Sequence, residues 1–291
     1  MKKTLIIALI ALFFPLHSRF NQELLAQPGE ARLLLLWWNV ENLFDTSDDP
    51  TTDDDDFTPE GARRWTTKKL LLKQLRIRHV FDAIRAFEEY RRYPDIAAFA
   101  ETENRTVLAS TLKNKHFPAY RTLYYDSPDP RGIDIGLAYN PKRVRLLSSK
   151  AYRVPLRKNK PTRNIVVAGL SAHGHPFHLV LNHWPSRAFD REWSERKRMI
   201  AARTARHIVD SLRSIDRNAD IIVMGDFNDE PKNRSLQTIL GSSEDAGLVR
   251  KHCSSLLYNC WSGYDGIGSY SYRNRFCQRS EERRVGKECR S

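Results

Sequence analysis

The stretch "IIVMGDFNDEP" at residues 221–231 joins four apolar residues to a polar end. A continuous apolar run of this length predicts a buried strand. Gly225, Asp226 and Asn228 then follow, and such residues are common in turns. However, residues two apart in an extended chain point to the same side, so Asp226 and Asn228 can face one target.

Three other predicted strands end in the same way. The strand within residues 31–40 reaches Asn39, the strand within 94–104 reaches Glu101, and the strand within 177–187 reaches His183. Each of these residues taken singly fits a turn or a structural role. Because α/β folds place ligand sites at the edge where strand ends gather, the recurrence favours one common site.

Helical spacing of apolar residues predicts one helix over residues 65–90 and another over 194–212, the second with Ser194 as its N-cap. "RGIDIGLAYNP" at 131–141 alternates as a half-buried strand should. The residues of the first helix that we expect to face the core are Leu72, Leu75, Val80, Ile84 and Phe87. Strands and helices alternate without repeats, which predicts one α/β domain.

The composition fits a globular protein, with 41% hydrophobic and 10% aromatic residues among 291. The net charge of +13 favours polyanionic partners such as nucleic acid or an anionic lipid surface. Four consecutive aspartates at 53–56 lack the spaced ligands of a calcium loop, so we expect a solvated loop.

Residues 1–26 read as a secretory signal peptide. Lys2 and Lys3 precede an apolar run, residues 5–16, that is too short to span a bilayer comfortably. The best cleavage site follows Ala26, and an uncleaved anchor is the alternative. We therefore expect a secreted, periplasmic or cell-envelope protein whose folded domain covers residues 27–278.

The last thirteen residues, "RSEERRVGKECRS" at 279–291, differ in character from the rest of the chain. They resemble the translation of a DNA-sequencing adapter, so we expect an artefactual tail and a native protein that continues past Gln278. A genuine charged terminus is the alternative. The tail holds five basic and three acidic residues, so without it the net charge falls from +13 to about +11.

The four cysteines lie near the end of the chain, and none has the paired spacing of a zinc site. An oxidising compartment would permit a bridge between Cys253 and Cys260.

The residues at the strand ends are carboxylates, amides and one imidazole. Oxygen ligands suit Mg²⁺, which usually takes one or two protein carboxylates and keeps several waters. Such an ion clamps phosphate oxygens in phosphoryl chemistry. Asp226 can orient or deprotonate an attacking water, Asn228 can donate to a phosphoryl oxygen, and His183 can donate to the phosphate or protonate the leaving group.

Five motifs together, in this order, resemble the endonuclease/exonuclease/phosphatase (DNase I-like) superfamily, in its secreted bacterial branch. The motifs are "WNVENLF", "AETEN", "RGIDIGLAYN", "NHWPSR" and "GDFNDEP". The resemblance covers residues 31–276 and implies a four-layered α/β sandwich. It also implies a hydrolase of phosphate esters that depends on Mg²⁺, with Mn²⁺ as the alternative ion.

The resemblance also assigns roles to single residues. It makes Glu101 the metal ligand, assisted by Asn39, and places Asp226 and Asn228 beside the scissile phosphate with His183. Two further residues are expected at the substrate, Arg187 and Asp134. For Arg187 a surface salt bridge is the alternative, while Asp134 can instead support the site. Tyr139, on the same strand as Asp134, is expected in the core.

One departure from the family pattern concerns the C-terminus. The family ends with a strand that carries an Asp-His pair for acid-base catalysis, and no such pair follows "GSYSYRNRF" at 268–276. We therefore expect the last strand or strands to be missing, and the chain as printed to be inactive or unstable.

The substrate stays open at the level of the sequence. Basic charge favours a nuclease that acts on DNA or RNA, because phosphate-backbone binding uses Lys and Arg. A sphingomyelinase-like enzyme and an inositol-phosphate phosphatase are the alternatives. A non-catalytic binding protein on the same fold is the alternative from another class. No stable protein partner is implied, so we expect a monomer.

Overall fold

The computed structural model describes residues 6–10, 32–157, 160–187 and 191–261. The chain divides into two compact units. The first unit contains Met1–Pro185 and Asn218–Asp226, and the second contains Ser186–Arg217 and Phe227–Ser291.

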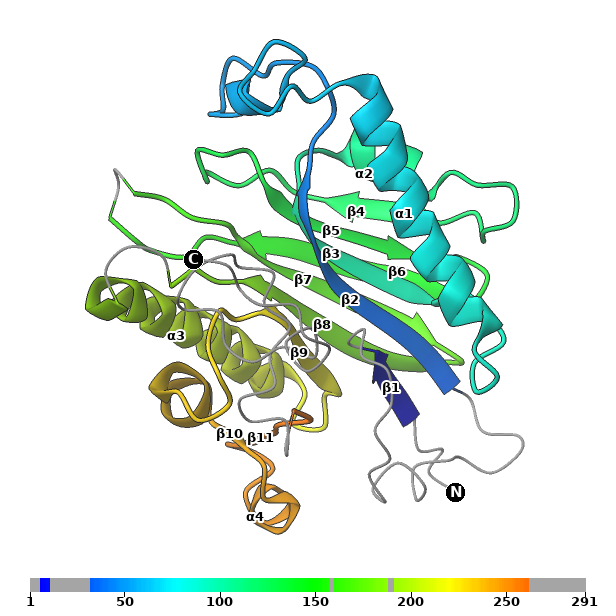
Figure 1. The fold of residues 1–291 in the computed structure, drawn as a ribbon. Coiled ribbons are helices and arrows are strands. Elements are labelled where there is room, and N and C mark those ends of the chain that lie inside the picture. The colour runs from blue at the N-terminus through cyan, green and yellow to red at the C-terminus, as the bar shows by residue number, and fades with distance from the viewer. Residues whose placement is uncertain (1–5, 11–31, 158–159, 188–190, 262–291) are drawn as a thin grey trace, which may run out of the picture. The chain divides into compact units, whose positions relative to one another are not determined.

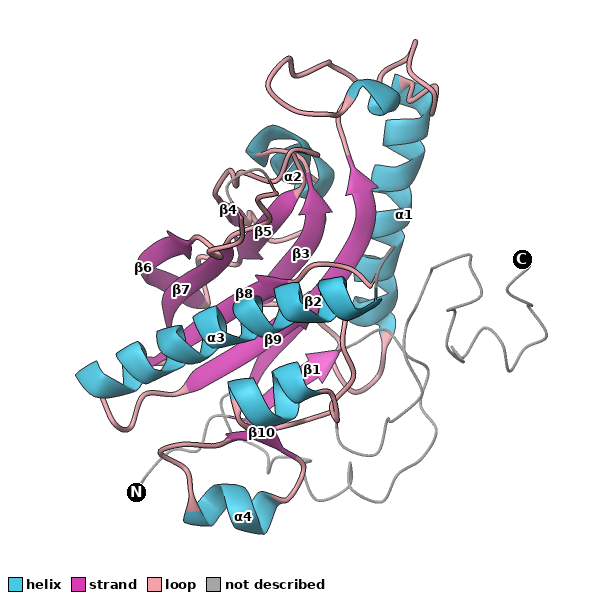
Figure 2. Ribbon diagram, turned by 90° about the vertical axis from the view of Figure 1, so that its left-hand side faces the viewer, coloured by secondary structure: helices cyan, strands magenta, loops and turns pink. Residues whose placement is uncertain are grey.

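The first sheet of the first unit has the strand order β1-β2-β3-β5-β4. Its strands are β1 (Ile6–Ile10), β2 (Arg32–Leu43), β3 (Ile96–Thr102), β4 (Arg121–Tyr124) and β5 (Asp134–Tyr139). β2 runs parallel to both β1 and β3, whereas β5 runs antiparallel to both β3 and β4. β2 and β3 therefore end at one edge of the sheet, where their arrowheads lie in Figure 2, and β5 begins at that edge.

The second sheet has the order β6-β7-β8-β9. Its strands are β6 (Val144–Tyr152), β7 (Ile165–Ala172), β8 (His175–His183) and β9 (Ile221–Asp226). β6, β7 and β8 form antiparallel pairs, while β8 and β9 are parallel. The parallel pair brings the ends of β8 and β9 side by side.

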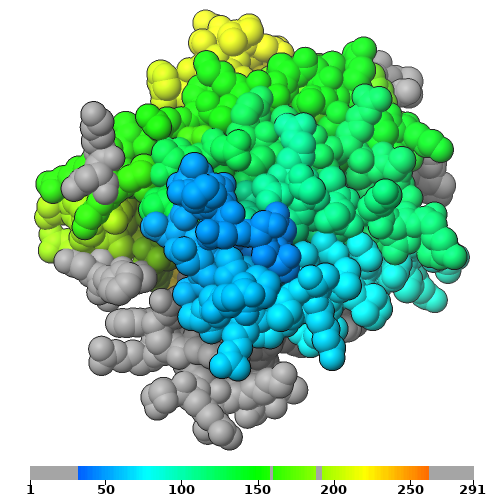
Figure 3. Space-filling view, turned by 90° about the horizontal axis from the view of Figure 1, so that it is seen from above, coloured from blue at the N-terminus to red at the C-terminus, as the bar shows by residue number. Residues whose placement is uncertain are grey.

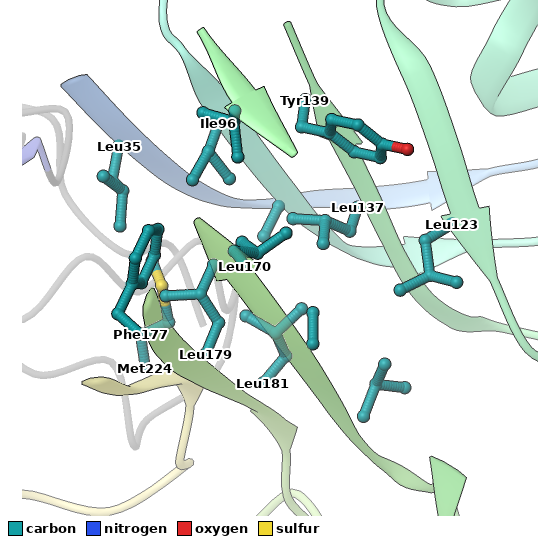
Figure 4. Packing of buried hydrophobic residues seen from close by; sticks show 14 of the residues in the cluster. Leu35, Ile96, Leu123, Leu137, Tyr139, Leu170, Phe177, Leu179, Leu181 and Met224 are labelled. Carbon is teal, nitrogen blue, oxygen red and sulfur yellow. The ribbon is translucent and has the colours of Figure 1, made fainter. Parts of the chain in front are cut away.

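A hydrophobic core fills the space between the two sheets. It combines inward-facing residues of β2, β3 and β5 with residues of β7, β8 and β9, and Figure 4 shows their side chains interdigitating. Leu35, Leu137, Leu170 and Leu179 are each fully buried there. Tyr139 is also buried, as the sequence predicted.

Two helices cover the opposite face of the first sheet, α1 (Thr67–Ala86) and α2 (Arg105–Leu112) (Figure 1). Ile77 and Phe81 of α1 pack with Leu108 of α2 against alternate residues of β2 and β3. Asn104 caps α2, since its side chain accepts a hydrogen bond from the backbone N–H of Val107. These layers confirm the α/β sandwich expected from the sequence.

The predicted inward face of α1 is partly wrong. Leu72, Leu75 and Phe87 are 45%, 44% and 43% exposed. The residues that α1 buries are Gln74, Ile77, Phe81 and Ile84. Apolar residues surround the first turns of the helix, so their spacing alone cannot decide which side faces the sheet.

The segment of residues 44–66 between β2 and α1 lies at the surface, where Figure 3 shows it in blue beside α1 in cyan. Phe44 and Phe57 stack at 4.0 Å between ring centroids, which ties the segment to the end of β2. The prediction that all four aspartates at 53–56 are solvated is wrong for one of them. Asp54 is 1% exposed and accepts a hydrogen bond from the backbone N–H of Asp49.

β5 also differs from its prediction. All six of its residues are buried, because the second sheet covers one face of β5 and α2 covers the other. The small residues of β5 permit this close packing, since a Cβ on Gly136 would lie 2.6 Å from Leu108.

The second unit contains α3 (Arg191–Ile215), a π-helical turn η3 (Ser235–Leu240), α4 (Ala246–Lys251) and a short strand pair, β10 (Ser242–Ser243) with β11 (Leu257–Tyr258). Ser194 does not cap α3, since the helix starts three residues earlier and Ser194 is 3% exposed within it. Cys253 and Cys260 are both free thiols.

Several predictions fall outside the described residues. They include most of the predicted signal peptide, the strand expected near residues 268–276 and the tail at 279–291. Within the described ranges, no helix combines the length and the apolar character needed to cross a bilayer.

Candidate active site

Five of the predicted site residues lie in the first unit. Glu101, His183 and Asp226 lie at or next to strand ends, whereas β2 continues past Asn39 to Leu43, which corrects the predicted end of that strand. Asn39 is on β2, Glu101 is on β3, and His183 and Asp226 are the last residues of β8 and β9. His183 and Asp226 are paired in the β8–β9 ladder. The fifth residue, Asp134, opens β5 opposite Thr102.

The ladder between β2 and β3 is interrupted at the site. Asn39 pairs with Ala100 and Leu43 pairs with Thr102, so three residues of β2 lie opposite Glu101 alone. Glu41, Asn42 and Glu101 have φ values of 55°, 61° and 62°. Such left-handed residues are costly without glycine, and β-bulges often re-aim side chains beside functional sites.

A bifurcated contact joins three strands. The Nδ2 group of Asn39 donates to Oε1 of Glu101 at 3.1 Å and to Oδ2 of Asp226 at 3.0 Å. The side-chain oxygen Oδ1 of Asn39 accepts from the backbone N–H of Glu41 at 2.9 Å, and Asn42 N–H donates to Oε2 of Glu101 at 3.0 Å. The irregular stretch of β2 thus holds both Asn39 and Glu101 in place.

Lys73 of α1 supports the same stretch. Its Nζ donates to the backbone oxygen of Glu41 at 2.7 Å. Burial lowers the pKa of Lys73, while the charges of Glu41 and Glu101 act in the opposite direction. α1 therefore contributes one cation to the backbone that carries the site.

His183 is 5% exposed, and its Nε2 lies 3.8 Å from Oε1 of Glu101. Burial lowers the pKa of His183 well below its usual value of 6.5, and the positive charges of Arg163 and Arg131 lower it further. Its Nδ1 has no hydrogen-bond partner within the described part of the chain. His183 is therefore neutral at pH 7, and as a neutral imidazole it carries a single N–H donor.

Asp134 is engaged in the interior. Its Oδ2 accepts from Ser127 N–H at 2.9 Å and from the Tyr124 hydroxyl at 3.3 Å, and burial raises its pKa to about 6. These contacts favour the alternative that Asp134 supports the site. A direct contact with substrate stays a prediction.

Arg187 and Asn228 belong to the second unit. Nε of Arg187 donates to the backbone oxygen of Asn228 at 2.8 Å, and its Nη2 donates to Asp229 and Asn233 at 3.2 and 2.8 Å. Arg187 therefore anchors the loop after β9, as the salt-bridge alternative implied. The substrate roles of Arg187 and Asn228 stay predictions.

The first unit offers a limited set of oxygen ligands for a metal ion. The carboxylates of Glu101 and Asp226 both accept a hydrogen bond from the side-chain amide of Asn39, so two negative charges lie close together. Among the described residues, no three His, Cys, Asp or Glu side chains gather as a metal cage. Mg²⁺ needs only one or two carboxylates plus water, so the pair of carboxylates fits such an ion.

Sequence reasoning missed three residues beside this site. Asp129 and Arg163 are buried and form an ion pair at 2.9 Å, and Arg131 bonds to the same carboxylate at 3.0 Å. Nη2 of Arg163 also donates to the backbone oxygen of Trp184, the residue after His183, at 2.6 Å. The only signal in the sequence was the turn-like "DPRG" at 129–132.

Comparison with known proteins adds the family. The sequence profile of the Endonuclease/Exonuclease/phosphatase family matches residues 35–278. No curated protein matches the chain.

Solved structures with a similar fold include the human Nocturnin catalytic domain with bound sulfate, which is 19% identical with a TM-score of 0.41 over 60% of this chain and 62% of that one. They also include D. rerio TDP2 complexed with a single-strand DNA product, at 17% identity and a TM-score of 0.45 over 71% and 64%. An endonuclease/exonuclease/phosphatase family protein from Bacteroides thetaiotaomicron is 12% identical, with a TM-score of 0.45 over 72% and 66%.

The chain thus spans less than two thirds of the first solved structures that it resembles. The profile match covers most of the chain and includes all five motifs found in the sequence. The chain therefore belongs to the endonuclease/exonuclease/phosphatase family.

Proposed function

We propose that this chain is a phosphodiesterase, most specifically an endonuclease, that uses a divalent cation and an in-line attack by water on phosphorus. The observation that carries the proposal is the hydrogen bonding of Asn39 to both Glu101 and Asp226, with a neutral His183 beside Glu101. Two carboxylates with different neighbours can take two different roles at one phosphate.

Glu101, assisted by Asn39, is the residue that would hold Mg²⁺ or Mn²⁺. The side-chain amide of Asn39 and the backbone N–H of Asn42 already orient the Glu101 carboxylate, so it offers a fixed ligand. A bound cation at this position supplies charge stabilisation to phosphate oxygens.

Asp226 is the residue that would orient the attacking water and accept its proton. Its carboxylate is fixed by Asn39, and its backbone oxygen accepts from Trp184 N–H at 2.8 Å. A carboxylate held in this way can hold water within hydrogen-bond reach of a phosphate.

His183 would donate its one N–H to a phosphoryl oxygen. The lowered pKa of His183 makes it a poor proton source at pH 7, so this role replaces the general-acid role that the sequence left open.

The basic charge of the chain supports a nucleic-acid substrate over a phospholipid or an inositol phosphate. The test uses the full-length gene product on supercoiled plasmid, single-stranded DNA, sphingomyelin and inositol phosphates, each with Mg²⁺ and with EDTA. We expect nicking of DNA with Mg²⁺ only. Turnover of sphingomyelin or an inositol phosphate, without DNA cleavage, would assign the site to that substrate.

Substitution separates the site from a contaminating nuclease. Glu101→Gln and Asp226→Asn should each lower the rate by about 100-fold to 10,000-fold. Glu88→Gln, at an exposed position after α1, is the matched control and should change nothing. DNA binding without cleavage of any substrate would favour the non-catalytic alternative.

We also propose that the chain is exported, on the strength of the N-terminal pattern of residues 1–26. Mass spectrometry of the protein from a cell-envelope or culture fraction measures the new N-terminus. An intact Met1 on protein from the cytoplasmic fraction would contradict export.

A further inference from the structure

A tight turn places one arginine at the edge where the candidate site lies. Gly132 N–H donates to the backbone oxygen of Asp129 at 3.1 Å, with Pro130 and Arg131 between them. Gly132 has a φ of 60°, and a Cβ there would lie 2.9 Å from Thr52. Two residues later Asp134 pairs with Thr102, the neighbour of Glu101, so the turn adjoins the end of β3.

The side chain of Arg131 is held by a buried carboxylate. Its Nε donates to Oδ1 of Asp129 at 3.0 Å and its Nη2 donates to Oδ2 at 3.2 Å. The Arg131 side chain is nonetheless 50% exposed, whereas that of Asp129 is 4% exposed. The side-chain hydrogen bonds of Arg131 to described protein groups use Nε and Nη2, and half of the side chain is accessible to solvent and to a ligand.

The same carboxylate also holds Arg163, whose side chain is 5% exposed and which donates to Oδ2 of Asp129 at 2.9 Å. Two guanidinium groups thus face one carboxylate, and the cluster carries an excess positive charge. Nε of Arg163 is buried without a partner among the described residues. The charge of Glu101 acts on Arg131 and the charge of Asp226 acts on Arg163, so both arginines lie within electrostatic reach of the site.

We propose that Arg131 is a phosphate-binding residue of this site, and that Asp129 positions it. The outward edge of a guanidinium matches two oxygens of a phosphate. Asp129 carries one negative charge and faces two arginines. The positive charge of the buried Arg163 therefore keeps the local potential positive. This inference rests on the proposed function for the identity of the phosphate, but not for the binding itself.

Binding is measured first without turnover. The full-length gene product in EDTA is titrated with inorganic phosphate by calorimetry. Arg131→Gln should weaken binding by roughly 10-fold to 100-fold, the value of a charge-assisted hydrogen bond pair. Arg121→Gln is the matched control, since Arg121 is exposed and lies at the opposite end of the same sheet, paired with Tyr139. Equal phosphate affinity in the Arg131→Gln and Arg121→Gln variants would overturn the proposal.

Asp129→Asn tests positioning against simple electrostatics. Loss of a negative charge beside two arginines would strengthen phosphate binding if charge alone acted. If Asp129 orients Arg131, the variant should bind phosphate several-fold more weakly. Circular dichroism checks that the variant is folded. A folded Asp129→Asn variant that binds more tightly would refute the positioning role, and Arg131→Gln would still decide the binding role.

Two substrates identify which phosphate is bound. Bis(p-nitrophenyl) phosphate carries only the phosphate that is cleaved, whereas an oligonucleotide also carries its neighbours. Loss of kcat/KM on both substrates assigns Arg131 to the cleaved phosphate, and loss on the oligonucleotide alone assigns it to a neighbouring one. Loss on neither overturns the proposal. If no phosphate ester is cleaved but phosphate binding depends on Arg131, the proposed function fails while this inference holds.

Discussion

Asn39 is the residue on which the candidate site depends most directly. Its single amide group donates to two carboxylates that would otherwise repel each other. A cation placed between the same carboxylates would serve the same electrostatic purpose. The amide and a metal ion therefore have overlapping effects on stability.

This overlap gives a test with Asn39→Asp. The variant removes the shared donor and adds a third carboxylate, so it should lower the free energy of unfolding in EDTA by about 1–3 kcal/mol. Mg²⁺ should restore more of this loss than it adds to the wild type. Urea unfolding with and without Mg²⁺ measures the loss of stability in EDTA and the stability that Mg²⁺ restores. Equal stabilisation of the wild type and the variant by Mg²⁺ would contradict the expected cation site.

His183 links stability to pH. Its pKa is lowered in the folded state, so below about pH 6.5 the unfolded chain takes up a proton that the folded chain refuses. The stability that neutral His183 provides is complete above that pH and is lost as the pH falls, by at most about 1.4 kcal/mol per pH unit.

The measurement compares wild type with His183→Asn by urea unfolding in EDTA at pH 7.5 and 5.5. The difference in stability between them should shrink, or change sign, at the lower pH. His79→Asn removes an exposed imidazole of α1 and is the control. A difference that is constant between the two pH values would contradict a buried neutral His183.

Among the elements, β9 depends on its penultimate residue. Gly225 pairs with Asn182 and has a φ of 155°, and a Cβ there would lie 2.1 Å from the backbone oxygen of Asn182. Because that oxygen belongs to a strand and cannot move aside cheaply, only glycine fits. The strand can then place Asp226 beside His183.

Gly225→Ala should therefore lower the free energy of unfolding by at least about 2 kcal/mol. Gly174→Ala is the comparison, since Gly174 has a φ of 83° in the β7–β8 turn with no atom within 4 Å of a Cβ. It should cost only about 1–2 kcal/mol, for backbone strain alone. Thermal unfolding of the two variants shows which substitution costs more stability. A larger loss for Gly174→Ala than for Gly225→Ala would show that β9 shifts freely.

α1 shows how far a sequence pattern reaches. Its existence follows from the spacing of apolar residues, although the predicted range 65–90 is longer than the observed Thr67–Ala86. Its buried face includes Gln74 and excludes Leu72 and Leu75. Gln74 is buried because its amide donates to the Ser110 hydroxyl of α2 at 3.0 Å. A tertiary hydrogen bond of this kind has no local sequence signal, so the choice of face cannot be predicted from the helix alone.

The exposed leucines give a prediction for this helix. Leu71 is exposed like Leu72 and Leu75. Leu71→Gln, Leu72→Gln and Leu75→Gln should each change the free energy of unfolding by less than about 0.5 kcal/mol. Phe81→Ala, at a fully buried position, should cost about 3–5 kcal/mol. Chemical denaturation ranks the four variants, and a large loss at Leu72 or Leu75 would mean that this face is covered in solution.

At the scale of the whole molecule, the strand ends were predictable and the loops were not. Asn39, Glu101, His183 and Asp226 could be grouped because α/β folds gather ligand-binding residues where strands end. The sequence did not predict that Asn39 and Glu101 belong to one sheet and His183 and Asp226 to another. The cluster of Asp129, Arg131 and Arg163 was not predictable. Arg163 precedes β7 and reaches Asp129 across 34 residues, and the contact depends on how two loops meet.

Net charge gives the last prediction. With a formal charge of +13, binding of DNA should weaken steeply as salt rises, because bound counterions are released from the phosphates. Fluorescence anisotropy with a labelled oligonucleotide in EDTA, at several salt concentrations, measures the slope of log K against log salt. Arg131→Gln should reduce the magnitude of that slope by about one. A slope near zero for the wild type would exclude phosphate contacts as the source of affinity.

The hydrogen bond between Asn39 and Asp226 joins residues that are 187 positions apart. During synthesis at about 5–20 residues per second, the second partner appears on the order of ten seconds or more after the first. Most of the first sheet, β2 to β5, can assemble with α1 and α2 within that interval. Glu101 is then in place before Asp226 has been synthesised. Appearance of the site therefore reports that the ribosome has passed residue 226, and a stalled shorter product would carry the first sheet but no pair of carboxylates.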